Sequence, residues 1–249
     1  MPPISRNSSL SQLLRRRPAV VELLEASGEH FWDQLDLSVE AYCRRAGLDA
    51  PAWLEKAMEM PVPAADSDWK EEPLHRITDF LTADHNHFRD RDLRKINELF
   101  DMHAIPVYPD KYVMSHAHQM FGYFEESFRE HMHEEEDRVF PHILRLEACS
   151  RNPGLKPILP HVSVSMFAAS QGHAAEKNLK KMVASIREKV RRHHIHEATA
   201  EITGLLYDAL DDFEVRMIRH AEVETTVLFP RAVELENRFL RPPAFERHI

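Results

Sequence analysis

Apolar residues recur every three or four positions along four long stretches of the chain, a pattern typical of amphipathic helices. We expect these helices at about 73–100, 110–148, 162–191 and 195–239. The clearest stripes run through Ile77, Leu81, His85 and Phe88, through Phe121, Phe124, Phe128, His131 and Glu135, and through Leu206, Leu210, Phe213, Met217, His220, Glu224 and Val227. A third, weaker stripe includes Met166 and His173. Four long helices predict an all-α fold, an antiparallel four-helix bundle.

The first 60 residues predict a small helical domain made of short segments. Ser9 and Ser11 are candidates to cap the first helix and Ser38 to cap a later one, and Gly28 and Gly47 are expected to end helices. None of these segments is long enough to be stable alone, so they must pack on one another or on the rest. We therefore expect domain 1–60, a linker at 61–72 rich in proline, small and acidic residues, the bundle at 73–240, and an irregular tail at 241–249.

One motif, His-x3-Glu-x4-Phe-Pro, occurs twice on these stripes. The first copy has His131, Glu135 and Phe140-Pro141, and the second has His220, Glu224 and Phe229-Pro230. Residues four apart lie on one face of a helix, so each copy is expected to present an imidazole and a carboxylate side by side. Pro141 is expected to kink its helix or mark a boundary, with Phe-Pro packing the bundle end.

A single histidine precedes each copy at nearly equal spacing. His85 lies before His131, and His173 lies before His220. Four imidazoles and two carboxylates directed into one core predict a site for two metal ions, because buried polar groups are costly unless satisfied. Imidazole suits iron, zinc, copper and nickel, while paired carboxylates favour harder cations. We expect two iron ions joined by an oxo or hydroxo bridge, with Glu135 and Glu224 bridging or terminal.

The neighbouring polar residues fit the pattern less well. His87 projects away from the stripe that His85 continues, and His133, Glu134, Glu136 and Glu222 do not match between the two copies. Glu176, one turn from His173, is a further candidate for the site or its surroundings. A lone histidine is more often structural, and the duplication is what favours the metal. The carboxylate-rich ferritin-like motif has the opposite order, and no His-Glu-x-x-His of a zinc hydrolase occurs.

Composition narrows the classes of partner. The formal net charge of −9 argues against a nucleic-acid-binding protein, which would present a basic face. Two cysteines are too few for a disulfide framework, which indicates a reducing, cytoplasmic compartment. Charged residues interrupt the apolar segments near the start, and no apolar run reaches membrane-spanning length. A signal peptide and a membrane partner are therefore not expected.

At these residues the chain resembles the hemerythrin-like HHE cation-binding domains, over about residues 73–235. Within that group it is most similar to the repair-of-iron-centres family. The resemblance implies a di-iron four-helix bundle whose ligands fall on His85, His131, Glu135, His173, His220 and Glu224. Oxygen-carrying hemerythrins have a fifth histidine one turn after the third-helix ligand. Lys177 holds that position here, which argues against a simple oxygen carrier.

The resemblance extends weakly into the first 60 residues. Cys43 and Gly47-Leu48-Asp49 match the family's short helical domain, but its Cys-Cys pair falls on Trp32-Asp33. Any redox or cluster-transfer role assigned to that pair is therefore in doubt for this chain. His30, nearby, is expected to be an exposed loop residue.

The resemblance implies that the chain is a stress-response protein. It would bind or reduce nitric oxide or oxygen, or donate iron for iron–sulfur cluster repair. The expected partners are a small diatomic ligand and an iron–sulfur protein or electron donor, and a homodimer stays open. The alternative is a non-enzymatic sensor of oxygen, nitric oxide or iron that signals through its N-terminal domain. Whether the chain is an enzyme stays undecided between the two.

Overall fold

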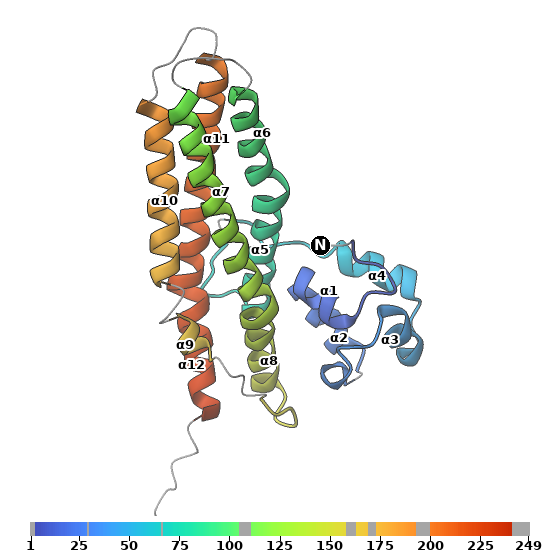
Figure 1. Ribbon diagram of the computed structural model, residues 1–249. Coiled ribbons are helices and arrows are strands. Elements are labelled where there is room, and N and C mark those ends of the chain that lie inside the picture. The colour runs from blue at the N-terminus through green and yellow to red at the C-terminus, as the bar shows by residue number, and fades with distance from the viewer. Residues whose placement is uncertain are drawn as a thin grey trace, which may run out of the picture. The chain divides into compact units, whose positions relative to one another are not determined.

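The structure is a computed structural model that describes residues 3–28, 30–65, 67–104, 111–157, 163–168, 173–192 and 200–240. Every extended regular element in these ranges is helical, and an isolated bridge joins Ser9 and Ser38 (Figure 1). The all-α prediction is confirmed. The chain divides into two compact units, which we call unit 1 (Met1–Ala83, Glu136–Ser165 and Val227–Ile249) and unit 2 (Asp84–Glu135 and Met166–Thr226).

Short helices open unit 1, as the sequence predicts. They are α1 (Leu10–Arg16), η1 (Pro18–Val20), α2 (Val21–Ala26), η2 (Phe31–Asp33), α3 (Val39–Ala46) and α4 (Ala50–Met58). The predicted caps are confirmed: the Ser9 hydroxyl accepts the Gln12 N–H, and the Ser38 hydroxyl accepts the Ala41 N–H. Gly47 ends α3 with φ +69°, a left-handed conformation that favours glycine. These helices share one apolar core centred on Leu10, Leu13, Leu24, Phe31 and Tyr42.

Unit 1 also contains α8 (Phe140–Arg151), α12 (Phe229–Leu240) and most of α5 (Leu74–His87). Helix α1 contacts α8, and α8 contacts α12. By contacts, the N-terminal helices are therefore grouped with α8 and α12 in one unit. The limits 1–60, 61–72 and 73–240 remain a prediction about independent folding. The described residues between α4 and α5 carry no helix, and 241–249 lie outside the described residues.

Two buried glutamates fix the starts of helices in unit 1. Glu147 on α8 accepts the N–H groups of Leu74 and His75, at 2.7 and 3.0 Å, at the start of α5. Glu236 on α12 accepts the N–H groups of Val164 and Ser165, at 3.0 and 3.3 Å, at the start of α9 (Val164–Phe167). The first N–H groups of a helix have no partner within the helix, so each carboxylate satisfies donors that burial would otherwise leave costly.

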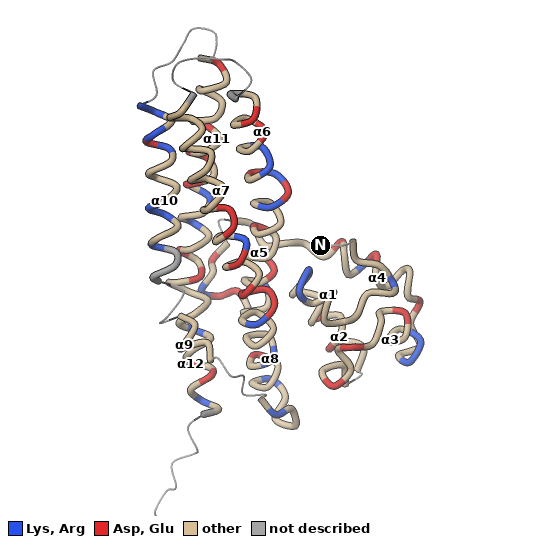
Figure 2. The backbone as a smooth tube through the Cα atoms, in the orientation of Figure 1, with Lys and Arg blue, Asp and Glu red and all other residues tan. Residues whose placement is uncertain are grey.

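Unit 2 contains η3 (Phe88–Asp92), α6 (Leu93–Ala104), α7 (Lys111–Glu134), α10 (His173–Arg192) and α11 (Ala200–Val223). Helix α6 contacts α7 and α11, and α10 also contacts both α7 and α11, which closes a ring of four helices (Figure 1). Lys and Arg residues are distributed along the length of α10 (Figure 2). One of them, Arg187, places its Nε 2.7 Å from Glu214 Oε2 of α11. Most of the predicted stripes of the first, second and fourth long helices are buried in this unit, while Ile77, Leu81 and Val227 are buried in unit 1.

Aromatic side chains fill the centre of unit 2. Phe88, Phe124, Phe128 and Phe213 are buried, with ring centroids 5.3–5.7 Å apart in edge or stacked pairs. Burial of each such side chain stabilises the fold by about 1.5–3 kcal/mol. The third stripe is less regular than predicted: Met166 is 59% exposed and Phe167 is buried in its place. Residues 169–172, which follow, lie outside the described residues.

Three of the long helical stretches contain a wider π-helical turn. These turns are η3, η4 (Glu135–Val139) and η7 (Glu224–Leu228). Pro141 and Pro230 follow η4 and η7 at equivalent places, one residue into α8 and α12. Proline has no N–H to donate to the carbonyl four residues earlier, so the preceding turn opens. The boundary predicted at Pro141 is therefore found as a π turn, and the second copy repeats it.

Within the described residues, no helix combines the length and apolar character needed to cross a bilayer.

Candidate metal centre

Four of the six predicted ligands converge in unit 2. His85, Glu135, His220 and Glu224 each place one ligand atom within 4.8 Å of the others, and all four side chains are buried. His85 lies in the last turn of α5 and His220 in the last turn of α11, while Glu135 and Glu224 are the first residues of η4 and η7. Residues far apart in the sequence thus form one buried group that can hold a metal ion.

The distances within this group match the spacing of ligands around a metal. His85 Nε2 lies 3.1 Å from His220 Nε2 and 3.5 Å from Glu135 Oε2. His220 Nε2 lies 3.1 Å from Glu224 Oε1. A metal with ligand atoms about 2.1 Å away separates neighbouring ligand atoms by roughly 3.0–3.4 Å. The group is therefore close to the arrangement that a bound cation requires.

His131 lies beside the group but is not one of the four. Its Nε2 is 3.4 Å from Glu135 Oε1, so the i, i+4 pairing predicted for the first motif copy is observed. The second copy shows the same pairing between His220 and Glu224. His131 therefore reaches the same carboxylate as His85, from the opposite oxygen.

The predicted ligands of the third helix are His173 and, as a further candidate, Glu176. His173 begins α10, but its side chain and that of Glu176 lie outside the described residues. Lys177, at the position of the fifth hemerythrin histidine, is exposed. The ligand roles of His173 and Glu176 remain predictions.

The neighbouring residues that did not match between the motif copies do not belong to the group of four. His133 and Glu222 are exposed. His87 is partly buried and its Nε2 lies 3.3 Å from Asp92 Oδ1. Glu136 is buried.

Sequence reasoning missed Asp84. Its Oδ2 lies 3.5 Å from His220 Nδ1, the ring nitrogen that faces away from the other ligands. A carboxylate at that nitrogen orients a ligating imidazole and raises its basicity. An acidic residue next to a predicted ligand was the available signal, but the periodicity of α5 could not show that Asp84 faces a different helix.

Burial and neighbouring charges set the protonation of the site. Burial lowers the pKa of His131, which keeps this imidazole neutral. Burial also opposes charge on His220, but the carboxylates of Glu224 and Asp84 outweigh it and raise the pKa of His220. Burial acts against the charge of Glu224 as well, yet the His220 imidazole lowers the pKa of this carboxyl. The proton on His220 is the positive charge that a bound metal cation would replace.

A test of fit comes from the oxygens of Glu224. Both are fully buried and accept no backbone N–H of a described residue, and Oε1 lies 3.1 Å from Nε2 of His220. A buried carboxylate whose partner is an imidazole can exchange the imidazole's proton for a coordinated cation. The donor set of two imidazoles and two carboxylates suits a first-row transition metal. The residues present therefore fit a metal ion.

A small cavity of about 10 Å³ adjoins the centre. Its lining includes the site residues His131, His220 and Glu224 and the neighbouring residues Phe128, Leu179, Lys180 and Met217. This volume is close to the minimum that holds one water molecule. The space beside the centre is therefore small.

Searches of protein-family models and of curated protein sequences give no match to this chain. The assignment of the site therefore depends on the residues themselves.

Proposed function

We propose that this chain is a hemerythrin-like di-iron protein. In this proposal residues 73–240 form an antiparallel four-helix bundle. Its two iron ions are held by His85, His131, Glu135, His173, His220 and Glu224. The observation that carries the proposal is the buried group His85, Glu135, His220 and Glu224, in which Glu224 meets the His220 imidazole but accepts no backbone N–H of a described residue. The duplicated motif, with a π turn at each glutamate, adds support because it supplies equivalent ligands to two metals.

The bound irons would supply one-electron redox chemistry and open coordination positions. The side chains of the centre have distinct tasks beside them. Glu135 and Glu224 bind, Asp84 orients His220 through Nδ1, and Phe128, Leu179 and Met217 exclude bulk water from the adjoining cavity. The small size of that cavity favours a small ligand over a large organic substrate.

The function we propose is to bind or reduce nitric oxide or oxygen, or to donate iron for iron–sulfur cluster repair under nitrosative or oxidative stress. The site of action would be the cytoplasm. An iron–sulfur protein or an electron donor would be the macromolecular partner. Trp32 and Asp33 in place of a thiol pair leave the metal centre as the reactive part of the protein.

Metal content and an optical spectrum test the proposal. The protein should be purified without a metal-affinity tag, loaded with iron anaerobically and analysed for elements. We expect two irons per chain, near-ultraviolet absorption of a bridged di-iron centre, and nitric oxide consumption by the reduced protein. His131→Ala should lower the iron content, whereas His133→Ala, two residues away and exposed, should not. No iron, or a single zinc, after loading would exclude a di-iron centre.

A second candidate function is a sensor, favoured by one contact. Arg15 Nη1 of α1 lies 2.7 Å from Asp137 Oδ1 in η4, and Asp137 follows the ligand Glu135 by two residues. A change of ligation at Glu135 would alter the turn that α1 contacts. The sensor predicts ligand binding without turnover and a change in amide-hydrogen protection of α1. Turnover with unchanged protection of α1 would favour the first function.

A further inference from the structure

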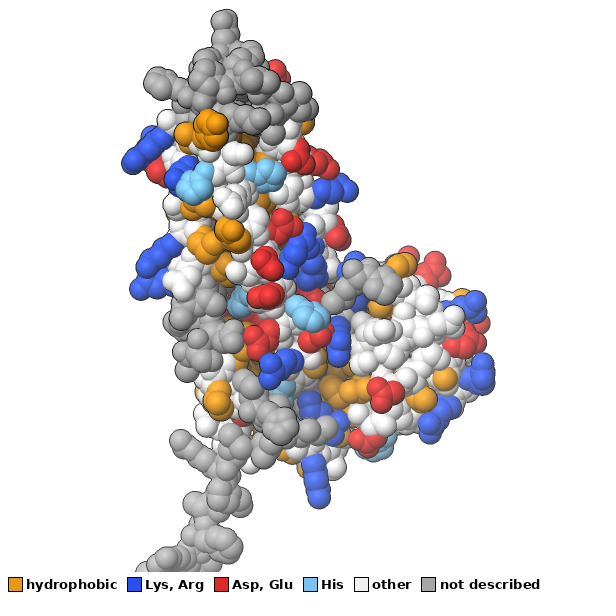
Figure 3. Space-filling view, in the orientation of Figure 1, with side chains coloured by type: hydrophobic (Ala, Val, Ile, Leu, Met, Phe, Trp, Pro, Cys, Tyr) orange, Lys and Arg blue, Asp and Glu red, His pale blue; other side chains and the backbone are white. Residues whose placement is uncertain are grey.

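A second cavity lies within unit 1, and the proposed metal chemistry does not involve it. Its volume is about 270 Å³. Apolar side chains form much of its lining, among them Leu14, Trp32, Leu35 and Leu144. Figure 3 shows hydrophobic side chains with Lys and Arg side chains beside them where α1 and α8 lie. A concave apolar space with a few polar groups is the usual form of a small-molecule site.

Arg145 lines this cavity and is only 8% exposed. Its Nε and Nη2 donate to the Lys156 carbonyl oxygen at 3.3 and 3.1 Å, and its guanidinium carbon lies 5.2 Å from the centre of the Trp32 ring. Its Nη1 is buried and donates to no acceptor among the described residues. A carbonyl and an aromatic face satisfy part of this group, but neither carries the negative charge that a buried arginine normally pairs with.

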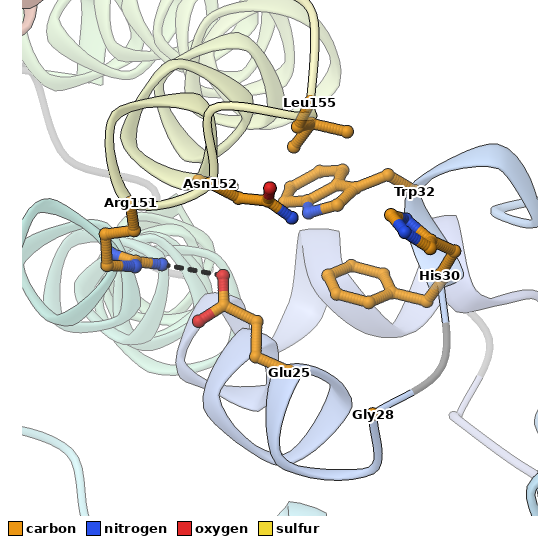
Figure 4. A pocket seen from close by; sticks show the side chains of 9 residues that line it. Glu25, Gly28, His30, Trp32, Arg151, Asn152 and Leu155 are labelled. Carbon is orange, nitrogen blue, oxygen red and sulfur yellow. Dashed lines mark hydrogen bonds and ion pairs between the residues drawn. The ribbon is translucent and has the colours of Figure 1, made fainter.

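The other arginines of this region do have carboxylate partners. Arg15, which lines the same cavity, pairs with Asp137 at 2.7 Å. Arg151 pairs with Glu25 at 2.8 Å beside a neighbouring cavity of about 380 Å³, where Trp32 lies with His30 and Leu155 (Figure 4). Among the described residues, no carboxylate oxygen lies within 4.0 Å of the nitrogens of Arg145. The larger cavity thus has balanced charge, and the smaller one has a positive charge in excess.

The thiol of Cys149 does not compensate this charge. Burial raises the pKa of Cys149, and the nearby charge of Arg145 lowers it by less. The thiol therefore stays protonated and neutral at neutral pH. The positive charge of Arg145 remains unbalanced.

We propose that this cavity binds a small amphipathic carboxylate. Its carboxylate would pair with the guanidinium of Arg145, and its hydrocarbon part would contact Leu14, Leu35, Leu144 and the Trp32 ring. One unpaired guanidinium calls for one negative charge, and a guanidinium matches the planar geometry of a carboxylate. The volume limits the hydrocarbon part to a short chain or a single ring.

Calorimetric titration of the full-length protein with octanoate tests this inference, with octan-1-ol as the uncharged ligand of equal chain length. We expect wild-type protein to bind octanoate more tightly than octanol. Arg145→Gln should weaken octanoate binding by about tenfold or more and leave octanol binding nearly unchanged, because a charge-assisted hydrogen bond is lost. The matched control is Arg151→Gln, on the same helix at the neighbouring cavity, and it should bind octanoate as wild type does.

A second variant keeps the test decisive if Arg145→Gln folds poorly. Leu35→Phe adds bulk to the apolar wall and leaves the charge of Arg145 in place. It should weaken both octanoate and octanol. Equal affinity of wild type for octanoate and octanol, or undiminished octanoate binding in Arg145→Gln, would overturn the inference. Neither result would bear on the iron content, so the metal centre is judged separately.

Discussion

The two units of this protein use buried glutamates in opposite ways. In unit 1, Glu147 and Glu236 accept backbone N–H groups from the starts of α5 and α9, and each also pairs with a histidine, His75 at 2.7 Å and His142 at 2.9 Å. In unit 2, the oxygens of Glu224 accept no backbone N–H of a described residue, and Oε1 lies 3.1 Å from His220 Nε2. The same residue type at similar burial thus caps helix starts in one unit and lies among the imidazoles of the candidate centre in the other.

This difference separates structural carboxylates from ligands. Glu147 and Glu236 stand at equivalent places in the two halves of the chain, twelve residues after Glu135 and Glu224. Each half therefore has one glutamate in the candidate metal centre and one that secures a helix start. Satisfied hydrogen bonds make the helix-capping glutamates stabilising without a cation, whereas Glu224 depends on a protonated His220 or on a bound cation to offset its burial.

The substitution expected to distinguish the metal-site glutamates from the helix-capping glutamates most strongly is Glu224→Ala. Removing this carboxylate should reduce iron affinity by more than the roughly 10–100-fold caused by losing a partner outside the ligand shell. The metal-free protein should also be less stable than wild type at neutral pH, because protonated His220 loses a buried carboxylate partner. Iron titration and urea unfolding of the metal-free protein measure both. Glu222→Ala, two residues away and exposed, is the matched control. Retained iron affinity in Glu224→Ala would contradict the comparison.

The next effect, on stability, is expected from Glu236→Ala. This change leaves the His142 ring and the N–H groups of Val164 and Ser165 without their acceptor, which should lower the free energy of unfolding by about 3–5 kcal/mol. Iron stoichiometry of the folded protein should not change. Glu234→Ala removes an exposed carboxylate of the same helix and should cost less than about 1 kcal/mol. Urea unfolding distinguishes the two variants, and an equal loss in both would refute the structural role of Glu236.

The smallest effect is a pH dependence at His75. Burial opposes the charge of His75, but Glu147 and Glu22 outweigh it and raise the pKa of His75 above its ordinary 6.5. Burial likewise opposes the charge of Glu147, but His75 lowers the pKa of this carboxyl below its ordinary 4.5. The contribution of His75 to the free energy of unfolding is complete below pH 6.5 and is lost as pH rises through its raised pKa. The contribution of Glu147 to the free energy of unfolding is present above pH 4.5 and is lost as pH falls through its lowered pKa.

The pair therefore stabilises the fold most between pH 4.5 and pH 6.5. As the pH rises above 6.5, the urea midpoint of wild type should decrease relative to the urea midpoint of His75→Gln, because the variant has no histidine to titrate at this position. Arg76, near Glu22, and Arg151, near Glu147, stay charged throughout and do not alter the sign. Parallel pH profiles of the two proteins would show that the pair does not contribute.

Local sequence determined much of this protein. Helix periodicity predicted the long apolar stripes, and the serine residues Ser9 and Ser38 predicted two helix caps. The i, i+4 spacing predicted the contacts of His131 with Glu135 and of His220 with Glu224. These features depend on neighbours within about one helical turn, where backbone geometry dictates which side chains meet. Reading the two motif copies against each other also selected His131 over His133, which is exposed.

Other features appeared only in the tertiary structure. Asp84 lies beside His220 and Glu147 caps α5 because elements distant in the sequence pack together, and periodicity within one helix does not tell which partner it faces. The lone charge of Arg145 is of the same kind, since whether an arginine is paired depends on every helix around it. Spacing along a helix is a property of the chain itself, whereas the satisfaction of a buried charge is a property of the assembled core.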